Sequence, residues 1–273
     1  MAPIYTKALI IGATSGIGEA LAAKLVSSGS RVIVAGRRQD RLDHFVATHG
    51  ADHATAMHLD AAQLSDIPAF ASSVVSAHPD LDCVVVNAGI QRAFDFSKPD
   101  TVDFAQLGLE LTTNYTSAVH LTTAFLPHLT TLKTQGHLVF VGATLALVPG
   151  LIRTPNYNAS KAALHAFVMA LRQQLKEAGQ SSLRIVEVFP PAVQTELHDT
   201  KHQPDLVNGG ELGMPLGAYT DKMYDGLVRG DEQFAVGPGE DLLREGGWEA
   251  QRMDMFQKQN VAIQESLAKF IRR

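Results

Sequence analysis

Tyr157 and Lys161, in the segment YNASK, are the side chains of this sequence best suited to chemistry. A separation of four places both on one face of a helix. A fixed ammonium beside a phenol favours the phenolate, so we expect Lys161 to lower the pKa of Tyr157 toward that of a useful proton donor to a carbonyl oxygen. Such pairs are also common on solvated helix faces, so other motifs must decide.

A glycine-rich turn lies near the N-terminus, between a predicted strand at 7–11 and a predicted helix at 16–28. Its glycines would permit a tight turn, a close approach of the backbone to a pyrophosphate, and close packing of helix on strand. The spacing Gly-x3-Gly-x-Gly differs from the commonest dinucleotide fingerprint, and a structural turn is the alternative. The predicted cofactor-binding residues here are Gly12, Thr14, Ser15, Gly16, Ile17 and Gly18.

Two arginines follow the next predicted strand, at 31–36. A cofactor without a 2′-phosphate would call for an acidic residue at the strand end, where Gly36 stands. Arg37 instead offers a planar, permanently charged donor fork suited to a phosphate, and Arg38 adds a second cation. The pattern therefore favours NADP(H) over NAD(H). In the alternative, both arginines are solvated surface charges.

Short apolar runs alternate with amphipathic stretches up to about residue 190, which predicts βαβ units and a parallel sheet covered on both faces. Strands are expected at 7–11, 31–36, 54–59, 82–87, 136–142, 184–189 and 233–236, and helices at 16–28, 39–49, 63–77, 101–112, 114–132 and 156–178. Closely spaced Pro and Gly predict a mobile substrate loop at about 196–232 without long regular elements. A C-terminal helical extension is expected at about 240–273, with its helix at 240–271, all within one domain of 1–273.

Composition excludes several classes of protein. The net charge is -5 with no long run of either sign, so neither nucleic acid nor an anionic membrane is an expected partner. No apolar stretch is long enough for a membrane span. Cys83 is the only cysteine, which excludes an intrachain disulfide and fits a reducing, cytoplasmic location. No metal is expected, and the couple His198 and His202 is interpreted as a surface-loop pair.

Five motifs in order make the chain resemble the short-chain dehydrogenase/reductase family over about residues 5–196. They are the glycine-rich turn, Asp60, Asn87-Ala88-Gly89, Asn114, and Tyr157-x3-Lys161. The resemblance implies an α/β fold, a Rossmann-like doubly wound parallel sheet of about seven strands in a three-layer sandwich. It also implies hydride transfer between a nicotinamide and a carbonyl or alcohol.

The resemblance implies roles for the catalytic residues. Tyr157 would exchange the proton, Lys161 would bind the nicotinamide ribose, and Asn114 would hold a water that links Lys161 to solvent. The family usually has a serine about thirteen residues before the tyrosine, where this chain has Thr144. The segment 136–158 contains no serine, so Thr144 must supply the hydroxyl unless Thr154 does.

The resemblance also implies cofactor contacts along the cleft. Asp60 would hold the adenine, and the nicotinamide end would be met by Pro190, Val193 and Thr195 in the segment PPAVQT. The family more often has glycine where Pro191 stands, and a proline there removes a backbone donor. The remaining cofactor-binding positions are Asn87, Ala88 and Gly89, together with Tyr157 and Lys161.

These observations predict an NADPH-dependent oxidoreductase that reduces the carbonyl of a small or medium organic substrate. The apolar segment 145–151 suggests a hydrophobic substrate, with a pocket lined by Leu145, Ala146, Leu147, Val148, Pro149 and Leu151. One alternative is an NADP(H)-binding regulatory protein with little turnover, motivated by Thr144 and Pro191. Another is an interaction protein that uses its C-terminal helix. The resemblance implies a homodimer or homotetramer, through helices near 101–132 and 156–178.

Overall fold

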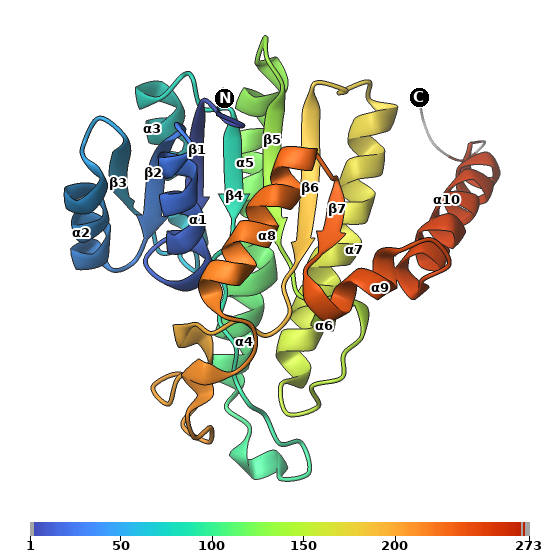
Figure 1. Cartoon of the computed structure of the whole chain (residues 1–273). Helices are drawn as coiled ribbons and strands as arrows, with labels where there is room; N and C mark the ends of the chain where they lie inside the picture. Colours follow the sequence, from blue (N-terminus) through green and yellow to red (C-terminus); the bar gives the residue numbers. More distant parts are fainter. Residues whose placement is uncertain (1–2, 269, 271–273) are drawn as a thin grey trace.

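The computed structural model describes residues 3–268 and 270 and contains a seven-stranded parallel sheet (Figure 1). Its order is β3-β2-β1-β4-β5-β6-β7, with every neighbouring pair parallel. The chain order reverses between β1 and β4, and ligands of such sheets bind at the carboxyl ends of the strands at this point. The strands are β1 (Lys7–Ile11), β2 (Arg31–Gly36), β3 (Ala54–His58), β4 (Cys83–Val86), β5 (Gly136–Val141), β6 (Leu183–Phe189) and β7 (Gln233–Ala235).

Helices cover both faces of the sheet, which confirms the predicted three-layer Rossmann-like fold. The helices are α1 (Gly16–Ser27), α2 (Gln39–His49), α3 (Ile67–Ala77), α4 (Phe104–Leu111), α5 (Ser117–Thr131), α6 (Thr144–Leu147), α7 (Pro155–Glu177), α8 (Leu216–Arg229), α9 (Glu240–Leu243) and α10 (Trp248–Leu267). Short 3-10 turns are η1 (Leu64–Asp66), η2 (Pro99–Thr101), η4 (Glu196–His198), η5 (Gly209–Glu211) and η6 (Gly237–Gly239), and η3 (Thr112–Thr116) is a π-helical turn.

Alternation along the strands divides the core into two layers. Leu9 and Ile11 of β1 pack in the cluster that includes α3, α5 and α7. Ala8 and Ile10 face the other way, into the cluster that includes α1, α2 and α8. Nearly every residue of the central strands is buried, as expected where helices cover both faces.

The segment predicted as an irregular loop at 196–232 contains a regular helix, so that part of the prediction is wrong. The helix α8 buries Tyr219, Met223 and Leu227 against the sheet, at the i, i+4, i+8 spacing of one helical face. Gly230 then ends the helix in the left-handed conformation, with φ 75°. The irregular part of this segment therefore ends before Leu216.

Three long predicted helices are also divided. The stretch 101–112 holds η2 and α4, and 114–132 begins within the π-helical turn before α5. The extension beyond residue 240 forms α9 and α10, and the expected end of its helix at 271, like residues 269, 272 and 273, lies outside the described residues. No helix within 3–268 and 270 is both long and apolar enough to cross a membrane.

Candidate active site

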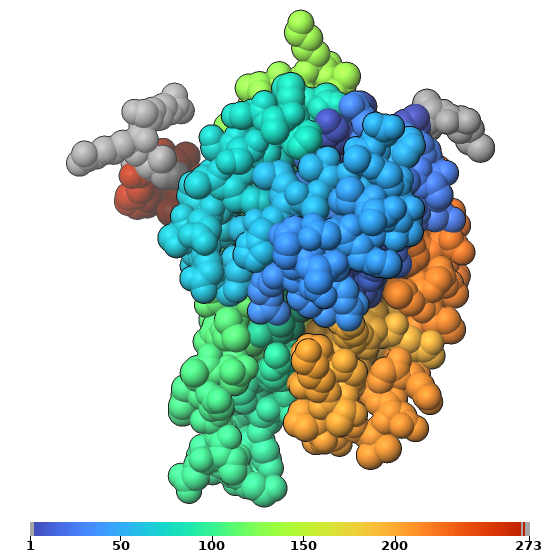
Figure 2. Space-filling view, turned by 90° about the vertical axis from the view of Figure 1, so that its left-hand side faces the viewer, coloured from blue at the N-terminus to red at the C-terminus, as the bar shows by residue number. Residues whose placement is uncertain are grey.

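A cavity of about 730 Å³ opens at the carboxyl ends of the strands. One wall comes from the segment after β4, including Gln91 and Arg92, and the opposite wall from Leu197 and Lys201. Figure 2 shows these two sides as separate lobes, green and orange, with a hollow between them below the N-terminal half. The sequence-predicted residues that line the cavity are Gly12, Thr14, Ser15, Gly16, Ile17, Arg37, Arg38, Asp60, Asn87, Ala88, Gly89, Thr144, Tyr157, Lys161, Pro190, Val193 and Thr195.

The glycine-rich turn has the close packing that its spacing predicts. Gly12 has φ 87°, and a β-carbon there would lie 2.7 Å from the backbone of Ala88. Gly18 does not line the cavity, and a β-carbon on it would collide with the Gly12 carbonyl oxygen. The Asn87 amide donates to that same oxygen at 2.8 Å, which fixes the turn to the end of β4. The glycines therefore leave the backbone of the turn, which lines the cavity, accessible to a phosphate.

Arg38, rather than Arg37, is tied to this turn. Its guanidinium donates to the Thr14 hydroxyl at 2.9 Å and 3.0 Å, and to the Ser15 hydroxyl at 2.6 Å. Arg37 lines the cavity with an exposed side chain and forms no hydrogen bond or ion pair with any described residue. Asp60 accepts from the Ala62 backbone at 3.0 Å at the same end. Hydroxyls, cations and open glycine backbone together fit a phosphate-bearing dinucleotide.

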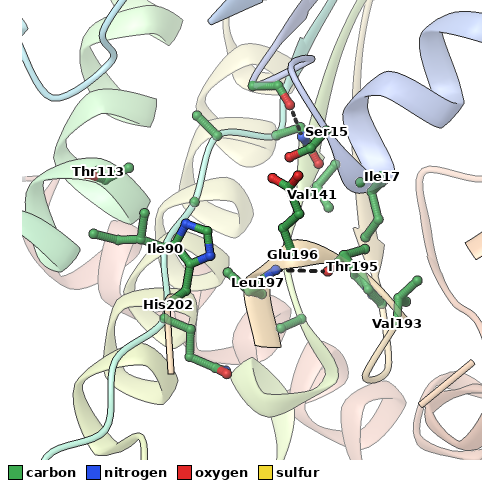
Figure 3. A pocket seen from close by; sticks show the side chains of 18 of the residues that line it. Ser15, Ile17, Ile90, Thr113, Val141, Val193, Thr195, Glu196, Leu197 and His202 are labelled. Atoms are coloured by element: carbon green, nitrogen blue, oxygen red, sulfur yellow. Dashed lines mark hydrogen bonds between the residues drawn. The ribbon is translucent and has the colours of Figure 1, made fainter. Parts of the chain in front are cut away.

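Glu196 is a cavity residue that the sequence analysis missed. Its carboxylate accepts from Arg38 at 2.6 Å and from Arg41 at 3.0 Å. Figure 3 shows this carboxylate pointing toward Ser15 and the glycine-rich turn. Burial alone would raise the pKa of Glu196, but hydrogen bonds from Arg38 and Ser15 and the charges of both arginines lower it to about 2. The protein thus places its own anion beside the cations expected to bind phosphate.

Tyr157 and Lys161 lie on the first turns of α7 and are both buried. The Lys161 ammonium donates to the Val141 carbonyl oxygen at 2.8 Å and lies 5.8 Å from the centre of the Tyr157 ring. The Tyr157 hydroxyl forms no hydrogen bond within the described chain, and its side chain lines the cavity. The phenol of Tyr157 and the ammonium of Lys161 therefore line the same cavity, and both extend from α7.

The sequence predicts that the pKa of Tyr157 is lowered, and for the protein by itself this prediction is wrong. Burial raises the pKa of Tyr157 well above its usual value, and the Glu110 carboxylate raises it further. Glu110 is held nearby because it accepts from the Asn156 amide at 2.6 Å. Burial also lowers the pKa of Lys161, to about 8, against the opposing effect of Glu187. The sequence argument counted the neighbouring cation but not the desolvation of both groups.

Asn114 lies behind the cavity rather than in its wall. Its side-chain oxygen accepts from the Ile90 amide at 2.8 Å, and its amide nitrogen donates to the Ile90 oxygen at 2.9 Å and to Ser160 at 3.0 Å. It stands in the π-helical turn η3, a local widening often found at functional sites. These contacts fasten the segment after β4 to α7 beside Lys161.

The structure separates the two threonines considered for the third hydroxyl. Thr144 begins α6 and lines the cavity. Its methyl group faces Gly239, where a β-carbon would come within 2.5 Å, and its hydroxyl has no partner among the described residues. Thr154 is fully buried outside the cavity, and its hydroxyl donates to the Leu151 oxygen at 3.3 Å. The geometry therefore favours Thr144 over Thr154 as the source of the third hydroxyl.

The segment after β6 forms a wall of the cavity that reaches the glycine-rich turn. The Pro190 oxygen accepts from the Thr144 amide at 2.9 Å, which joins this segment to α6. Val193 is buried and pairs with Met214 in an isolated parallel bridge. The Thr195 side chain lies against Gly16, where a β-carbon would be 3.1 Å away. This segment therefore contacts both α6 and the glycine-rich turn.

The substrate end of the cavity is more polar than predicted. Of the expected apolar segment, Leu145 and Leu151 line it, whereas Ala146 and Leu147 pack in a separate small cluster with Phe189. Residues missed from sequence line it too, among them Gln91, Arg92, His198, Lys201 and His202. The histidine couple therefore belongs to the cavity, and Figure 3 shows His202 turned toward Ile90. No group of residues in 3–268 and 270 could hold a metal ion.

Comparison with models of known protein families identifies the family of this chain. The family model for short chain dehydrogenases matches residues 6–205. The chain belongs to the short-chain dehydrogenase/reductase family. The oxidoreductase DltE of Bacillus subtilis is 33% identical over 226 residues, covering 83% of this chain and 86% of the relative.

Solved structures of other short-chain dehydrogenases share this fold. One from Burkholderia phymatum, in complex with NAD, has a TM-score of 0.77 at 19% identity, covering 87% of this chain and 91% of that one. Another from Sphingobium yanoikuyae, in complex with NADPH, has a TM-score of 0.75 at 21% identity, covering 98% and 96%. Membership of the family, together with the glycine-rich cradle, makes this short-chain dehydrogenase an oxidoreductase suited to a nicotinamide cofactor.

Proposed function

We propose that the protein is an NADPH-dependent reductase that converts the carbonyl of a small or medium organic substrate to an alcohol, reversibly. One observation carries the proposal: the phenol of Tyr157 and the ammonium of Lys161 face the same cavity as the glycine-rich turn. A structural helix face has no need of a buried ammonium, because burying it costs free energy unless a partner compensates.

Each side chain has a distinct task in this reaction. When bound, the nicotinamide supplies the hydride that reaches the carbonyl carbon. Tyr157 donates its proton to the carbonyl oxygen, and its raised pKa keeps it protonated across neutral pH. Lys161 holds the ribose and favours the phenolate as it forms. Thr144 donates a hydrogen bond to the developing alkoxide.

The preference for NADPH rests on the residues after β2. Gly36 leaves no carboxylate where a ribose hydroxyl would need one, and Arg37 and Arg38 line the cavity beside it. Arg38 donates to the glycine-rich turn and is paired with an anion already, so a phosphate could take the place of Glu196. We infer that Arg38 makes the principal contact and that Arg37 adds charge at the rim.

The substrate is proposed to combine an apolar body with polar groups. Leu145, Leu151 and Leu212 supply apolar surface, while Gln91 and Arg92 supply hydrogen-bond donors. A hydrophobic ketone or quinone with an additional acceptor group suits this lining better than a purely aliphatic one.

The rival function is a nucleotide-binding protein without turnover, for which Thr144 and Pro191 are the motivation. NADPH consumption distinguishes the two when it is measured with a panel of ketones, diketones and quinones. We expect oxidation of NADPH with at least one member of the panel. NADPH binding without oxidation by any member would instead support the rival.

A further inference from the structure

One face of α7 carries three ionisable side chains, each one helical turn from the next: Tyr157, Lys161 and His165. The first two line the cavity, whereas His165 is fully buried beneath it. The reaction proposed above uses Tyr157 and Lys161 and leaves His165 without a role.

His165 lies between two buried carboxylates. Its Nδ1 is 2.7 Å from Oε2 of Glu187 on β6, and its Nε2 is 2.9 Å from Oε1 of Glu249 on α10. Only a ring protonated on both nitrogens can donate to both carboxylates. Burial lowers the pKa of His165, but the hydrogen bonds to Glu187 and Glu249 outweigh it and leave the pKa raised. Hydrogen bonds to both carboxylates therefore favour the imidazolium.

The second oxygen of Glu187 is unpaired near the end of β5, next to the residue whose carbonyl holds Lys161. Glu187 is fully buried, and its Oε1 has no hydrogen-bond partner among the described residues. That oxygen would lie 3.2 Å from a β-carbon on Gly142, the residue after Val141. Val141 supplies the carbonyl that holds the Lys161 ammonium, so the unpaired oxygen lies one residue from that point, and the charge of Glu187 acts on Lys161 to raise its pKa.

The charges alternate in sign from the cavity outward: Lys161, Glu187, His165, Glu249 and Arg252. Arg252 Nε lies 2.9 Å from Glu249 Oε2, and its side chain is 31% exposed, so the chain of charges ends at the surface of α10. Arg172 is a further charged group that interacts with both carboxylates, and it also interacts with Glu232. Burying so many charges costs several kcal/mol per ion unless they compensate one another, and apolar side chains could anchor α10 as well.

We propose that Glu187 is a positioning residue that keeps Lys161 cationic, and that His165 and Glu249 complete a buried charge chain through which α10 sets the protonation of Lys161. The inference rests on the proposed function of Lys161 as the cation that binds the cofactor. The two carboxylates then act in opposite directions. Glu187 stabilises the ammonium directly, whereas Glu249 keeps His165 charged, and the imidazolium offsets part of the charge of Glu187.

The decisive measurement is the titration of Lys161 by NMR of protein labelled with 13C at the lysine ε-carbons. The Lys161 signal is identified by its loss in Lys161→Met. We expect Glu187→Gln to move the titration midpoint of Lys161 down by about one pH unit, because it removes the adjacent charge. The matched variants Glu249→Gln and His165→Gln should move the midpoint up, because each leaves the charge of Glu187 less compensated. The pH above which NADPH binding weakens, followed by NADPH fluorescence, should move with the midpoint.

An unchanged or raised midpoint in Glu187→Gln, or an equal fall in Glu187→Gln and Glu249→Gln, would overturn the inference. If Glu187→Gln does not fold, His165→Gln decides instead, and an unchanged or lowered midpoint there contradicts the proposal. These readings need no turnover, so they remain distinct from a failure of the proposed reductase activity, which would appear as NADPH binding without NADPH oxidation.

Discussion

The two ends of the cleft hold their cations in different ways. Arg38 is 35% exposed and pairs with Glu196, a residue of the loop after β6. Lys161 is 4% exposed and is held by a backbone carbonyl of the sheet. A half-exposed ion pair contributes about 0–1 kcal/mol, so a ligand phosphate can replace it at little cost. A buried ammonium cannot exchange its partners so easily, and its surroundings set its pKa. The open end is thus suited to binding and the buried end to chemistry.

Among the cations of the cleft, removal of the buried one should have the largest effect. In Lys161→Met, the cavity loses the charge that we propose holds the ribose and favours the phenolate. We expect kcat/KM for NADPH to fall by at least about a hundredfold, the lower end of the usual range for an acid–base group. Steady-state kinetics at saturating carbonyl substrate measures this. If kcat/KM for NADPH fell only a few-fold, Lys161 at the buried end would contribute no more to the reaction than a cation at the open end.

The hydroxyl of Thr144 is expected to come next. Thr144→Ala should lower kcat by about a hundredfold if this group stabilises the alkoxide. Thr144→Ser keeps the hydroxyl and should retain most of the activity, while Thr154→Ala, outside the cavity, should leave kcat nearly unchanged. An unchanged kcat in Thr144→Ala would reject the role.

At the open end, Arg38→Gln should lower kcat/KM for NADPH by about tenfold, the lower range for a hydrogen bond to a charged group, and change that for NADH little. Arg37→Gln is the matched control with an expected smaller loss, whereas Arg37→Glu should lower the NADPH preference by repulsion. A wild-type enzyme that prefers NADH would contradict the assignment of the cofactor.

The smallest expected effect is an increase in the affinity for NADPH. Glu196→Gln removes the anion that competes with a phosphate for Arg38, so NADPH should bind a few-fold more tightly, consistent with an ion pair of about 0–1 kcal/mol. The pKa of Glu196 is lowered to about 2, so the carboxylate is ionised at every assay pH and the gain should not vary from about pH 5 to 9. Asp199→Asn on the same loop is the control. Weaker binding in Glu196→Gln would show that the loop assists the cofactor.

Regular elements were predictable from sequence where one local signal sets them. The apolar runs that became β1 and β2 are covered on both faces, and their predicted bounds are the observed ones. The helix α8 was not predicted because Pro215 and Gly217 at its start are residues typical of turns and loops. The spacing of Tyr219, Met223 and Leu227 is nevertheless that of one helical face. Pro215 only precedes the helix, and Gly217 falls in its first turn, where it does little harm.

The candidate site was less predictable where contacts join distant residues. Motif spacing placed Tyr157 beside Lys161, because both lie within one helix. No local pattern relates Glu196 to Arg38, or Glu249 to His165, which are 158 and 84 residues apart. The direction of the Tyr157 pKa depends on burial, which is a property of the assembled core rather than of the YNASK segment.

Tyr157→Phe, which removes only the phenolic oxygen from the buried end, gives the most direct test. NADPH oxidation with the carbonyl panel and NADPH binding would be measured on the same samples of wild type and variant. We expect wild type to oxidise NADPH, and the variant to bind NADPH with similar affinity but to turn over about 10²–10⁴-fold more slowly, as for loss of a general acid. A variant that keeps the wild-type rate would contradict the assignment of Tyr157 as the proton donor.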